Sequence, residues 1–288
     1  SYNYAVDTRQ GNSGELSNRG FEAELHATDL LSSKSLRWDL DFSLTKIRSR
    51  VESLPNGDII NGPKSLYVYR AGEDVYSFYL PTWLGVDPAT GLGRFLIDPT
   101  KPAEPSNITY RYDEAGRAPT KSAYPKVYGG LTNTLSYGGF TLSALVTYQF
   151  GGHLLEGSSH YVKGDGRRLG VLNQVKELVG NYWTPTNTSA SNPLPIFNSP
   201  LNSGEWSTRT IYSTDFIRLK ELSLSYALPK KVTDVLRLSS LRLSLTANNL
   251  LYLYAATKDK ELEVPINGFR ALDVPSLRTI SFGLNVGF

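Results

Sequence analysis

The sequence predicts an all-β protein of long, amphipathic, antiparallel strands, and three observations support this fold class. Apolar and polar residues alternate wherever the chain is regular, which places successive side chains on opposite faces of a strand. The connecting segments are rich in Gly, Pro, Asn and Ser, and no strong helix signal interrupts them. Short and long connections alternate strictly along the chain, as they do in a transmembrane antiparallel β-barrel.

Seven segments show the alternation of an amphipathic strand. They are residues 21–27, 36–45, 125–137, 140–150, 213–228, 241–247 and 279–288. The last segment shows the pattern best, because small or polar residues separate its five apolar ones, which are Ile280, Phe282, Leu284, Val286 and Phe288. In residues 213–228 the alternation changes parity at Lys220 and Glu221, which predicts a β-bulge.

The connections between these strands are of two kinds. Three are short, at residues 29–35, 137–139 and 229–240, and three are long, at residues 49–124, 151–212 and 254–276. Loops of more than about 15 residues are uncommon in compact domains and usually have a function.

The long connections contain weaker local signals. Residues 75–84 and 92–97 are predicted as two further strands that flank a turn at residues 87–91. This turn lacks the repeated carboxylates of a calcium-binding loop. The best helix signal is at residues 172–179, where we expect no more than a short loop helix.

The composition excludes several classes of protein. The 288 residues include no Cys, so neither a disulfide scaffold nor a thiolate metal site is possible. Three histidines, His26, His153 and His160, give too few ligands for a histidine-built metal cluster, and we predict no metal and no cofactor. A net charge of +3 gives no support for nucleic-acid binding. No run of 18 apolar residues is present, which excludes a transmembrane helix.

Two architectures accommodate seven amphipathic strands: a soluble β-sandwich with its apolar face inside, and a membrane β-barrel with its apolar face outside. The barrel is favoured because the strands are long, aromatic residues stand near their ends, and charges occupy the polar face. A sheet in lipid must close on itself, since an unpaired edge leaves backbone groups without partners. Seven is an odd number of strands, whereas bacterial single-chain barrels have an even number.

Five motifs carry a resemblance to a known family, and they occur in that family's order. They are NRGFE at residues 18–22, YPKVYGGLTNT at 124–134, DFIRLKELSLSYALP at 215–229, LRLSLTANNLL at 241–251 and PSLRTISFGLNVGF at 275–288. Together they resemble the carboxy-terminal part of the SusC/RagA family of TonB-dependent outer-membrane transporters.

The resemblance implies that residues 1–288 are the C-terminal part of a barrel of about 22 strands. We expect the plug domain, the early strands and the signal peptide to lie outside this chain, which would begin within a longer polypeptide. The implied function is TonB-driven import of glycans, peptides or similar nutrients across the outer membrane of a Gram-negative bacterium. The implied partners are a SusD-like surface lipoprotein, the rest of the barrel and plug, TonB, and outer-membrane lipid, without nucleic acid.

The candidate site residues are aromatic. Loop aromatics could contact substrate or a protein partner, because they combine a broad apolar surface with a polar tip; the alternative is ordinary loop packing. This set comprises Tyr67, Tyr69, Tyr76, Tyr79, Trp83, Trp183 and Trp206. In the family that the motifs resemble, a terminal aromatic is a signal for the barrel-assembly machinery, and Phe288 occupies that position; the alternative is an aromatic residue of the interfacial girdle.

Two other functions stay open at this point. A SusC-like barrel could serve as a non-transport structural subunit of an outer-membrane complex, with its long loops used for partner contact. A soluble β-sandwich adhesin or glycan-binding module is the third hypothesis. No acid, base and nucleophile form a recognisable set, so we predict that the chain is not an enzyme.

Overall fold

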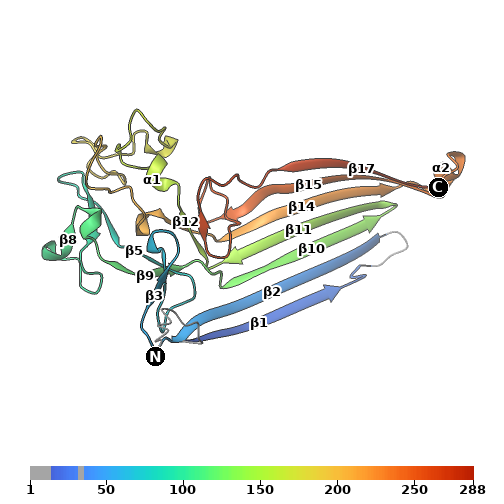
Figure 1. Cartoon of the computed structure of the whole chain (residues 1–288). Helices are drawn as coiled ribbons and strands as arrows, with labels where there is room; N and C mark the ends of the chain where they lie inside the picture. Colours follow the sequence, from blue (N-terminus) through green and yellow to red (C-terminus); the bar gives the residue numbers. More distant parts are fainter. Residues whose placement is uncertain (1–13, 32–35) are drawn as a thin grey trace, which may run out of the picture.

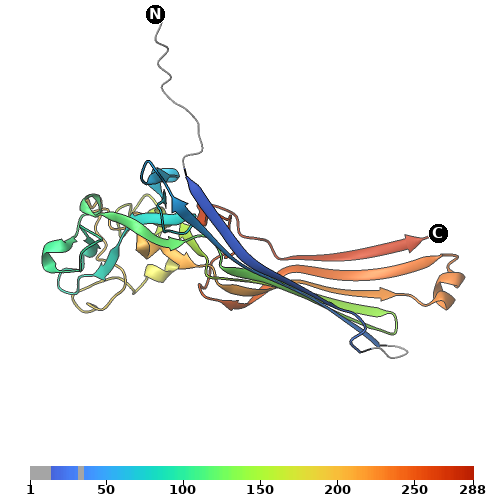
Figure 2. The same ribbon diagram turned by 90° about the horizontal axis from the view of Figure 1, so that it is seen from below.

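The computed structural model describes residues 14–31 and 36–288. It consists of one long sheet and a unit of folded loops at one end of that sheet (Figure 1). The sheet is twisted and curved along its length (Figure 2). None of the helices in these described ranges is long and apolar enough to cross a membrane.

The large sheet has seven antiparallel strands in the order β1-β2-β10-β11-β14-β15-β17. Their bounds are β1 Glu15–Ala27, β2 Leu36–Ser53, β10 Val127–Tyr137, β11 Phe140–Phe150, β14 Phe216–Ala227, β15 Ser240–Ala255 and β17 Thr279–Gly287. All seven predicted strands are therefore confirmed. Two of them, β2 and β15, extend well beyond their predicted ends into the loop unit.

The register places apolar residues side by side on one face of the sheet. One row crosses six strands through directly paired residues, namely Leu25, Phe42, Leu131, Val146, Leu219 and Leu251. This apolar face is not covered by a second sheet, because Ile280, Phe282 and Leu284 on β17 are 70%, 72% and 60% exposed. A soluble sandwich would bury these side chains, so the structure contradicts that alternative.

The predicted bulge is confirmed in β14. Val146 of β11 pairs with Leu219 and its neighbour Leu145 pairs with Glu221, which leaves Lys220 without a partner. The same irregularity appears in the pairing with β15. The extra residue restores the apolar alternation after the parity change.

Short connections close one end of the sheet. Gly138 and Gly139 join β10 to β11 and both have positive φ, at 55° and 90°; a two-residue hairpin turn of this kind matches the strand twist and favours glycine. The connection from β14 to β15 contains the helix α2 (Lys230–Val235). The connection from β1 to β2 includes residues 32–35, which are outside the described ranges.

Long connections fold together at the other end. Loop A is residues 54–126, loop B is residues 151–215 and loop C is residues 256–278. They contain three small sheets. The first comprises β3 (Ile59–Asn61), β4 (Tyr67–Tyr69), β5 (Ser77–Pro81) and β9 (Arg117–Ser122), and the second comprises β6 (Trp83–Val86), β7 (Gly93–Leu96) and β8 (Ile108–Thr109). The third comprises β12 (His153–Glu156), β13 (Ile211–Ser213) and β16 (Phe269–Arg270). The strands predicted at 75–84 and 92–97 are present, although the first is divided between β5 and β6.

Helical structure in the loops is limited to short turns. It comprises α1 (Ser159–Val162) and the 3-10 turns Pro63–Ser65, Pro105–Asn107, Tyr112–Glu114, Lys176–Leu178 and Thr208–Thr210. Residues 172–179 form only one of these turns. A segment of this length cannot sustain a helix unless tertiary packing supports it.

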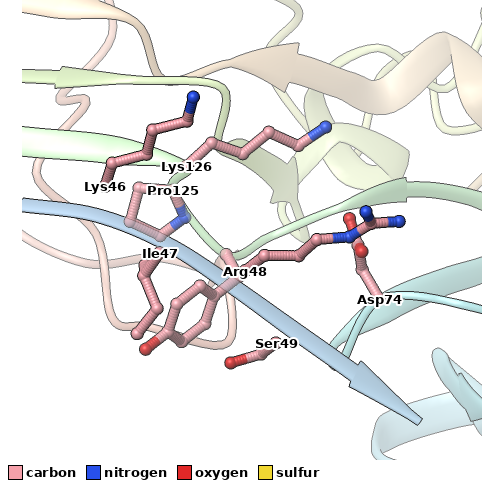
Figure 3. A pocket seen from close by; sticks show the side chains of 8 residues that line it. Lys46, Ile47, Arg48, Ser49, Asp74, Pro125 and Lys126 are labelled. Carbon is pink, nitrogen blue, oxygen red and sulfur yellow. The ribbon is translucent and has the colours of Figure 1, made fainter. Parts of the chain in front are cut away.

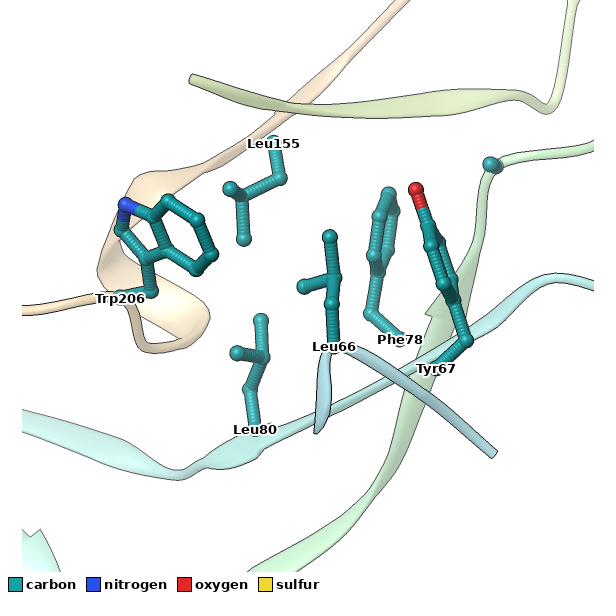
Figure 4. Close-up of a cluster of buried hydrophobic side chains, with 7 residues drawn as sticks. Leu66, Tyr67, Phe78, Leu80, Leu155 and Trp206 are labelled. Carbon is teal, nitrogen blue, oxygen red and sulfur yellow. The ribbon is translucent and has the colours of Figure 1, made fainter. Parts of the chain in front are cut away.

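The main hydrophobic core lies in the loop unit, between loops rather than behind the large sheet. Leu66, Phe78 and Leu80 of loop A pack against Leu155 and Trp206 of loop B (Figure 4). A partly buried aromatic of loop C, Phe269, joins the same cluster. Burial of this kind stabilises a unit by about 1.5–3 kcal/mol for each large apolar side chain, so the three loops form one packed body.

Candidate functional site

The polar face of the large sheet carries hydroxyl and charged side chains that pair across strands. Ser223 of β14 and Thr246 of β15 lie 3.1 Å apart between their hydroxyl oxygens. Nearer the short turns, His26 Nδ1 lies 2.8 Å from Asp41 Oδ1. Such a face accepts contact with water and with polar solutes, whereas the opposite face does not.

Loop C is attached to the polar face at the loop end of the sheet. Arg218 of β14 points from that face and its Nη1 lies 2.9 Å from both Glu261 Oε1 and Glu263 Oε2. The same nitrogen donates to the Tyr252 hydroxyl at 3.1 Å, and the guanidinium lies 4.6 Å from the centre of the Tyr252 ring. One arginine therefore connects two strands of the sheet to loop C.

Charge and packing around this arginine are balanced. Lys220 Nζ lies 2.5 Å from Glu263 Oε2, so two cations face two carboxylates. Between the two glutamates, Leu262 is fully buried in a small cluster with Leu154 and Phe216. We call Arg218, Lys220, Tyr252, Glu261 and Glu263 the loop C clamp.

The charged form of Glu261 favours the attachment of loop C to the large sheet. Burial alone would raise the pKa of Glu261. The hydrogen bonds that Glu261 accepts from the Tyr252 hydroxyl and from the backbone N–H of Glu263, together with the charge of Arg218, outweigh burial and lower the pKa of Glu261. The carboxylate therefore stays charged at neutral pH, and the clamp keeps its ion pairs.

Two cavities lie beside loop C. One, of about 360 Å³, lies between loop C and the polar face and is lined in part by Tyr128, Gln149, Phe216, Glu263 and Ile266. The other, of about 640 Å³, has many polar and charged residues in its lining, among them Tyr252, Lys258, Lys260, Glu261 and Arg278. Both combine aromatic or aliphatic surface with hydrogen-bonding groups, which suits amphipathic ligands.

Two of the predicted aromatic residues lie in the loop core. Tyr67 and Trp206 are each 6% exposed. The Tyr67 hydroxyl donates to the backbone oxygen of Asn267 at 2.8 Å, and the Trp206 indole donates to that of Gly157 at 2.9 Å. Both rings therefore contact other residues of this chain, and in this arrangement neither presents its face to solvent.

The other two tryptophans lie between loop segments. Trp83 packs edge-to-face on Phe95, and the Arg209 guanidinium lies 4.8 Å from its ring centre. Trp183 donates from its indole to the backbone oxygen of Pro88 at 3.0 Å and packs over Gly91, where a Cβ would come within 2.5 Å of the ring. Both remain partly exposed.

The remaining candidates are more accessible. Tyr69, Tyr76 and Tyr79 are half-buried, and burial raises the pKa of the Tyr69 hydroxyl. Phe288 is 96% exposed and follows the last residue of β17 on the parity of the apolar face. Tyr67 and Trp206 are thus buried, whereas the other candidate aromatics keep part of their surface exposed to solvent. Contact between these exposed rings and a substrate stays a prediction.

Sequence reasoning missed the buried ion pairs of the loops. Arg209 donates twice to Asp165, at 2.6 and 2.8 Å, and once to Asn192 at 2.9 Å. No periodic pattern connects residues so far apart in irregular segments. Arg218 did carry a signal, since it is a charged residue inside a strand motif, but its acidic partners in loop C could not be identified from spacing.

Metal chemistry has no support in the described residues. Across 14–31 and 36–288, no three His, Asp or Glu side chains are grouped so that they could hold a metal ion. The two histidines of loop B contact backbone oxygens: His153 Nδ1 lies 3.2 Å from that of Ser122 and His160 Nδ1 lies 2.8 Å from that of Gly157.

A curved antiparallel sheet with one exposed apolar face and one polar face defines a wall segment of a transmembrane β-barrel, with its long loops gathered at one end. Comparison with known proteins agrees with this class. No family model matches the chain. A curated relative, TonB-dependent receptor P3 of Formosa agariphila, is 24% identical over 310 residues, which cover 98% of this chain and 30% of the relative.

Solved structures give the same fold. The RagAB peptide transporter matches with a TM-score of 0.78 and 24% identity, over 96% of this chain and 30% of that one. The RagAB peptide importer matches in its closed-closed state with a TM-score of 0.75 and 23% identity, and in its open-open state with 0.76 and 24%. The resemblance to the C-terminal part of the SusC/RagA family of TonB-dependent transporters is thus confirmed, and the chain spans about 30% of the length of these relatives.

Proposed function

We propose that this chain forms part of the wall and of the extracellular mouth of a TonB-dependent nutrient importer in a bacterial outer membrane. The observation that carries the proposal is the two-faced sheet, in which a continuous apolar row crosses six strands while hydroxyl and charged groups occupy the other face. The apolar face would contact hydrocarbon and the polar face would line the lumen.

The edges of the sheet support a larger closed barrel. In the described residues, β1 and β17 each pair with one neighbouring strand of the large sheet, and their other edges carry unpaired backbone groups. Such edges are not tolerated in lipid. We propose that strands outside residues 1–288 complete the barrel and that a plug domain fills its lumen.

The mouth of the barrel would be shaped by loop C. The loop C clamp holds residues 261–263 against the polar face, next to two cavities of about 360 and 640 Å³. A substrate that enters the lumen along this part of the wall would pass these cavities. Import itself requires no covalent chemistry from the chain: substrate binds at the loops, the plug is displaced by TonB, and the substrate passes along the polar face.

We extend the proposal to the class of substrate and to a lipoprotein partner. RagAB, whose fold the chain shares, is described as a peptide importer. We propose an oligomeric nutrient, peptide or glycan, because the cavities offer both apolar and hydrogen-bonding contacts. A SusD-like lipoprotein would cover the loops and deliver the substrate.

Uptake in cells tests the function. Cells that carry the complete transporter are compared with cells that lack TonB and with cells that lack the proposed lipoprotein partner. Labelled peptide and glycan oligomers are supplied and their accumulation is measured. We expect uptake of one class to fall to background in both deletions. Undiminished uptake in both would refute the importer and favour a structural subunit.

A further inference from the structure

Towards the loop end of β2, basic side chains follow the apolar ones on the same face of the strand. Side chains two residues apart share a face of a strand, so Leu44, Lys46 and Arg48 point to the same side. In the neighbouring strand, Arg19 is paired with Arg48, and Phe21 is paired with Lys46. On β2 the apolar face therefore passes from hydrocarbon side chains to cations at Lys46, and on β1 it does so one row later, at Arg19.

This level corresponds to the border of a bilayer. At about 3.3 Å per residue, the step of about ten residues from Leu36 to Lys46 is about 33 Å long, and a strand tilt of about 40° gives a height of about 25 Å. The apolar band of outer-membrane barrels has the same height. Lys46 also shares its row with Phe21, Val127 and Phe150, a mixed aromatic and aliphatic border.

The cations at this border lack ionic partners among the described residues. Arg19, Lys46, Arg48 and Lys126 are exposed, and none lies within 4.0 Å of a carboxylate. Other cations do have such a partner: in the loops Lys64, Arg70, Lys101, Arg111, Arg167, Arg209 and Lys260, and in β14 Arg218 and Lys220. Four neighbouring positive charges repel one another unless an anion joins them.

A cavity of about 300 Å³ lies among these side chains, where β10 begins beside β2. Its lining contains three cations and one carboxylate among eight residues, which are Lys46, Ile47, Arg48, Ser49, Asp74, Tyr124, Pro125 and Lys126. Figure 3 shows Lys46, Arg48 and Lys126 on one side of the β2 ribbon, with Ile47 and Ser49 on the other. A single carboxylate, that of Asp74, offsets three cations in this cavity.

We propose that Lys46, Arg48 and Lys126, with Arg19 beside them, bind the phosphate group of a glycolipid in the outer leaflet. The inference rests on the proposed membrane placement. Arginine and lysine both bind phosphate strongly, and basic clusters at a membrane border select anionic headgroups. The position decides the source of the phosphate. Arg19, Lys46 and Arg48 continue the lipid-facing stripe, on the opposite side of the wall from the lumen, and Lys126 immediately precedes the adjoining strand β10.

The test uses the complete barrel in nanodiscs. Wild-type protein is compared with Arg19→Gln/Lys46→Gln/Arg48→Gln. A matched control, Lys230→Gln/Lys231→Gln/Arg237→Gln, removes three exposed cations from the opposite end of the sheet. Phosphorylated lipid A is added to phosphatidylcholine nanodiscs, and the lipid A retained per barrel is measured. Incorporation of the barrel into nanodiscs tests the membrane placement separately.

We expect the first variant to retain about ten-fold less phosphorylated lipid A, with a smaller difference at high salt, and the control to retain as much as wild type. Phosphatase-treated lipid A should be retained poorly by all three proteins. Equal retention of treated and untreated lipid A would overturn phosphate recognition. Displacement of lipid A by millimolar inorganic phosphate would overturn the lipid as the source, as would equal losses in the two variants.

Discussion

Arg218 of β14 and Glu261 of loop C form a buried ion pair, 2.9 Å between Nη1 and Oε1, with side-chain exposures of only 4% and 8%. The two residues belong to different parts of the molecule, one to the barrel wall and one to a loop. Breaking such a pair costs more than forming it contributes, since the remaining charge stays buried. The position of loop C beside the polar face therefore depends on this contact.

Glu261→Gln should release loop C. Glu263 still neutralises Arg218 in part, so we expect a local loss of roughly 2–3 kcal/mol rather than the full cost of a buried unpaired charge. Hydrogen exchange measured by mass spectrometry should accelerate in residues 256–278 and not in β10 or β11. The exposed pair Lys101–Asp98 provides the control, since Asp98→Asn should leave exchange in loop C unchanged. Equal protection of loop C in both variants would contradict the clamp.

Gly129→Ala should impair the stability of the barrel wall. Tyr148 covers Gly129 and donates from its hydroxyl to the backbone oxygen of Ser43 at 2.8 Å. A Cβ on Gly129 would come within 2.6 Å of that hydroxyl oxygen and closer still to the Ser43 oxygen. Gly130→Ala is the matched control, because its nearest neighbour would be 3.6 Å away. We expect a lower unfolding temperature on heated gels for the first variant only; similar temperatures for both would show that the close approach is relaxed in the membrane.

Phe282→Arg should prevent or weaken insertion, whereas Ser281→Arg should be tolerated. Phe282 is 72% exposed on the apolar face, and Ser281 pairs with Thr246 on the polar face. An arginine near the bilayer midplane costs about 2–4 kcal/mol, while one in a wet lumen costs little. The measurement is the yield of folded protein in liposomes. If Ser281→Arg were the more damaging change, the assignment of the two faces would be reversed.

The loop unit should lose stability at mildly acidic pH. Burial lowers the pKa of His153 and of His160 below the ordinary value of 6.5, against opposing hydrogen bonds to backbone oxygens. In the unfolded loops these imidazoles take up protons near pH 6.5, so stability is complete above that pH and falls as the pH drops through the lower folded values. The protection factors of the β12 amides, which correct for the slower intrinsic exchange at low pH, should fall between pH 7 and pH 5, and His153→Asn should reduce that dependence. An unchanged profile in the variant would exclude His153 as a contributor.

Substitutions of the loop aromatics should affect stability or substrate affinity according to how deeply each ring is buried. Trp206→Ala should destabilise the loop unit by about 3–5 kcal/mol, because the ring fills the core between loops A and B. Tyr69→Ala and Tyr79→Ala should cost less stability, and any loss of substrate affinity in them would report direct contact. Binding and thermal unfolding are measured on the same preparations. If Trp206→Ala alone lost substrate affinity and its unfolding were unchanged, Trp206 would be the contact residue and this prediction would be wrong.

Much of the sheet was predictable because a strand in a bilayer obeys a simple rule. A period of two residues decides which side chains meet lipid, so Ile280 and Phe282 could be assigned to a face without any coordinates. The parity change at Lys220 predicted a bulge that the register confirms. The motifs added the expectation of a partial barrel, and the shared fold with RagAB agrees with it.

The loops followed no such rule. Residues 172–179 gave only a weak helix signal and form one 3-10 turn, in line with the expectation of no more than a short loop helix. Trp206 and Tyr79 are both loop aromatics in the sequence, yet Trp206 lies in the loop core and Tyr79 is only half-buried. The sequence by itself determined the strands and their two faces, because these depend on local alternation, whereas β2 and β15 run further into the loop unit than the alternation predicted. Only the tertiary structure decided which distant residues meet, such as Arg218 with Glu261 and Arg209 with Asp165, because such contacts depend on how separate loops pack together.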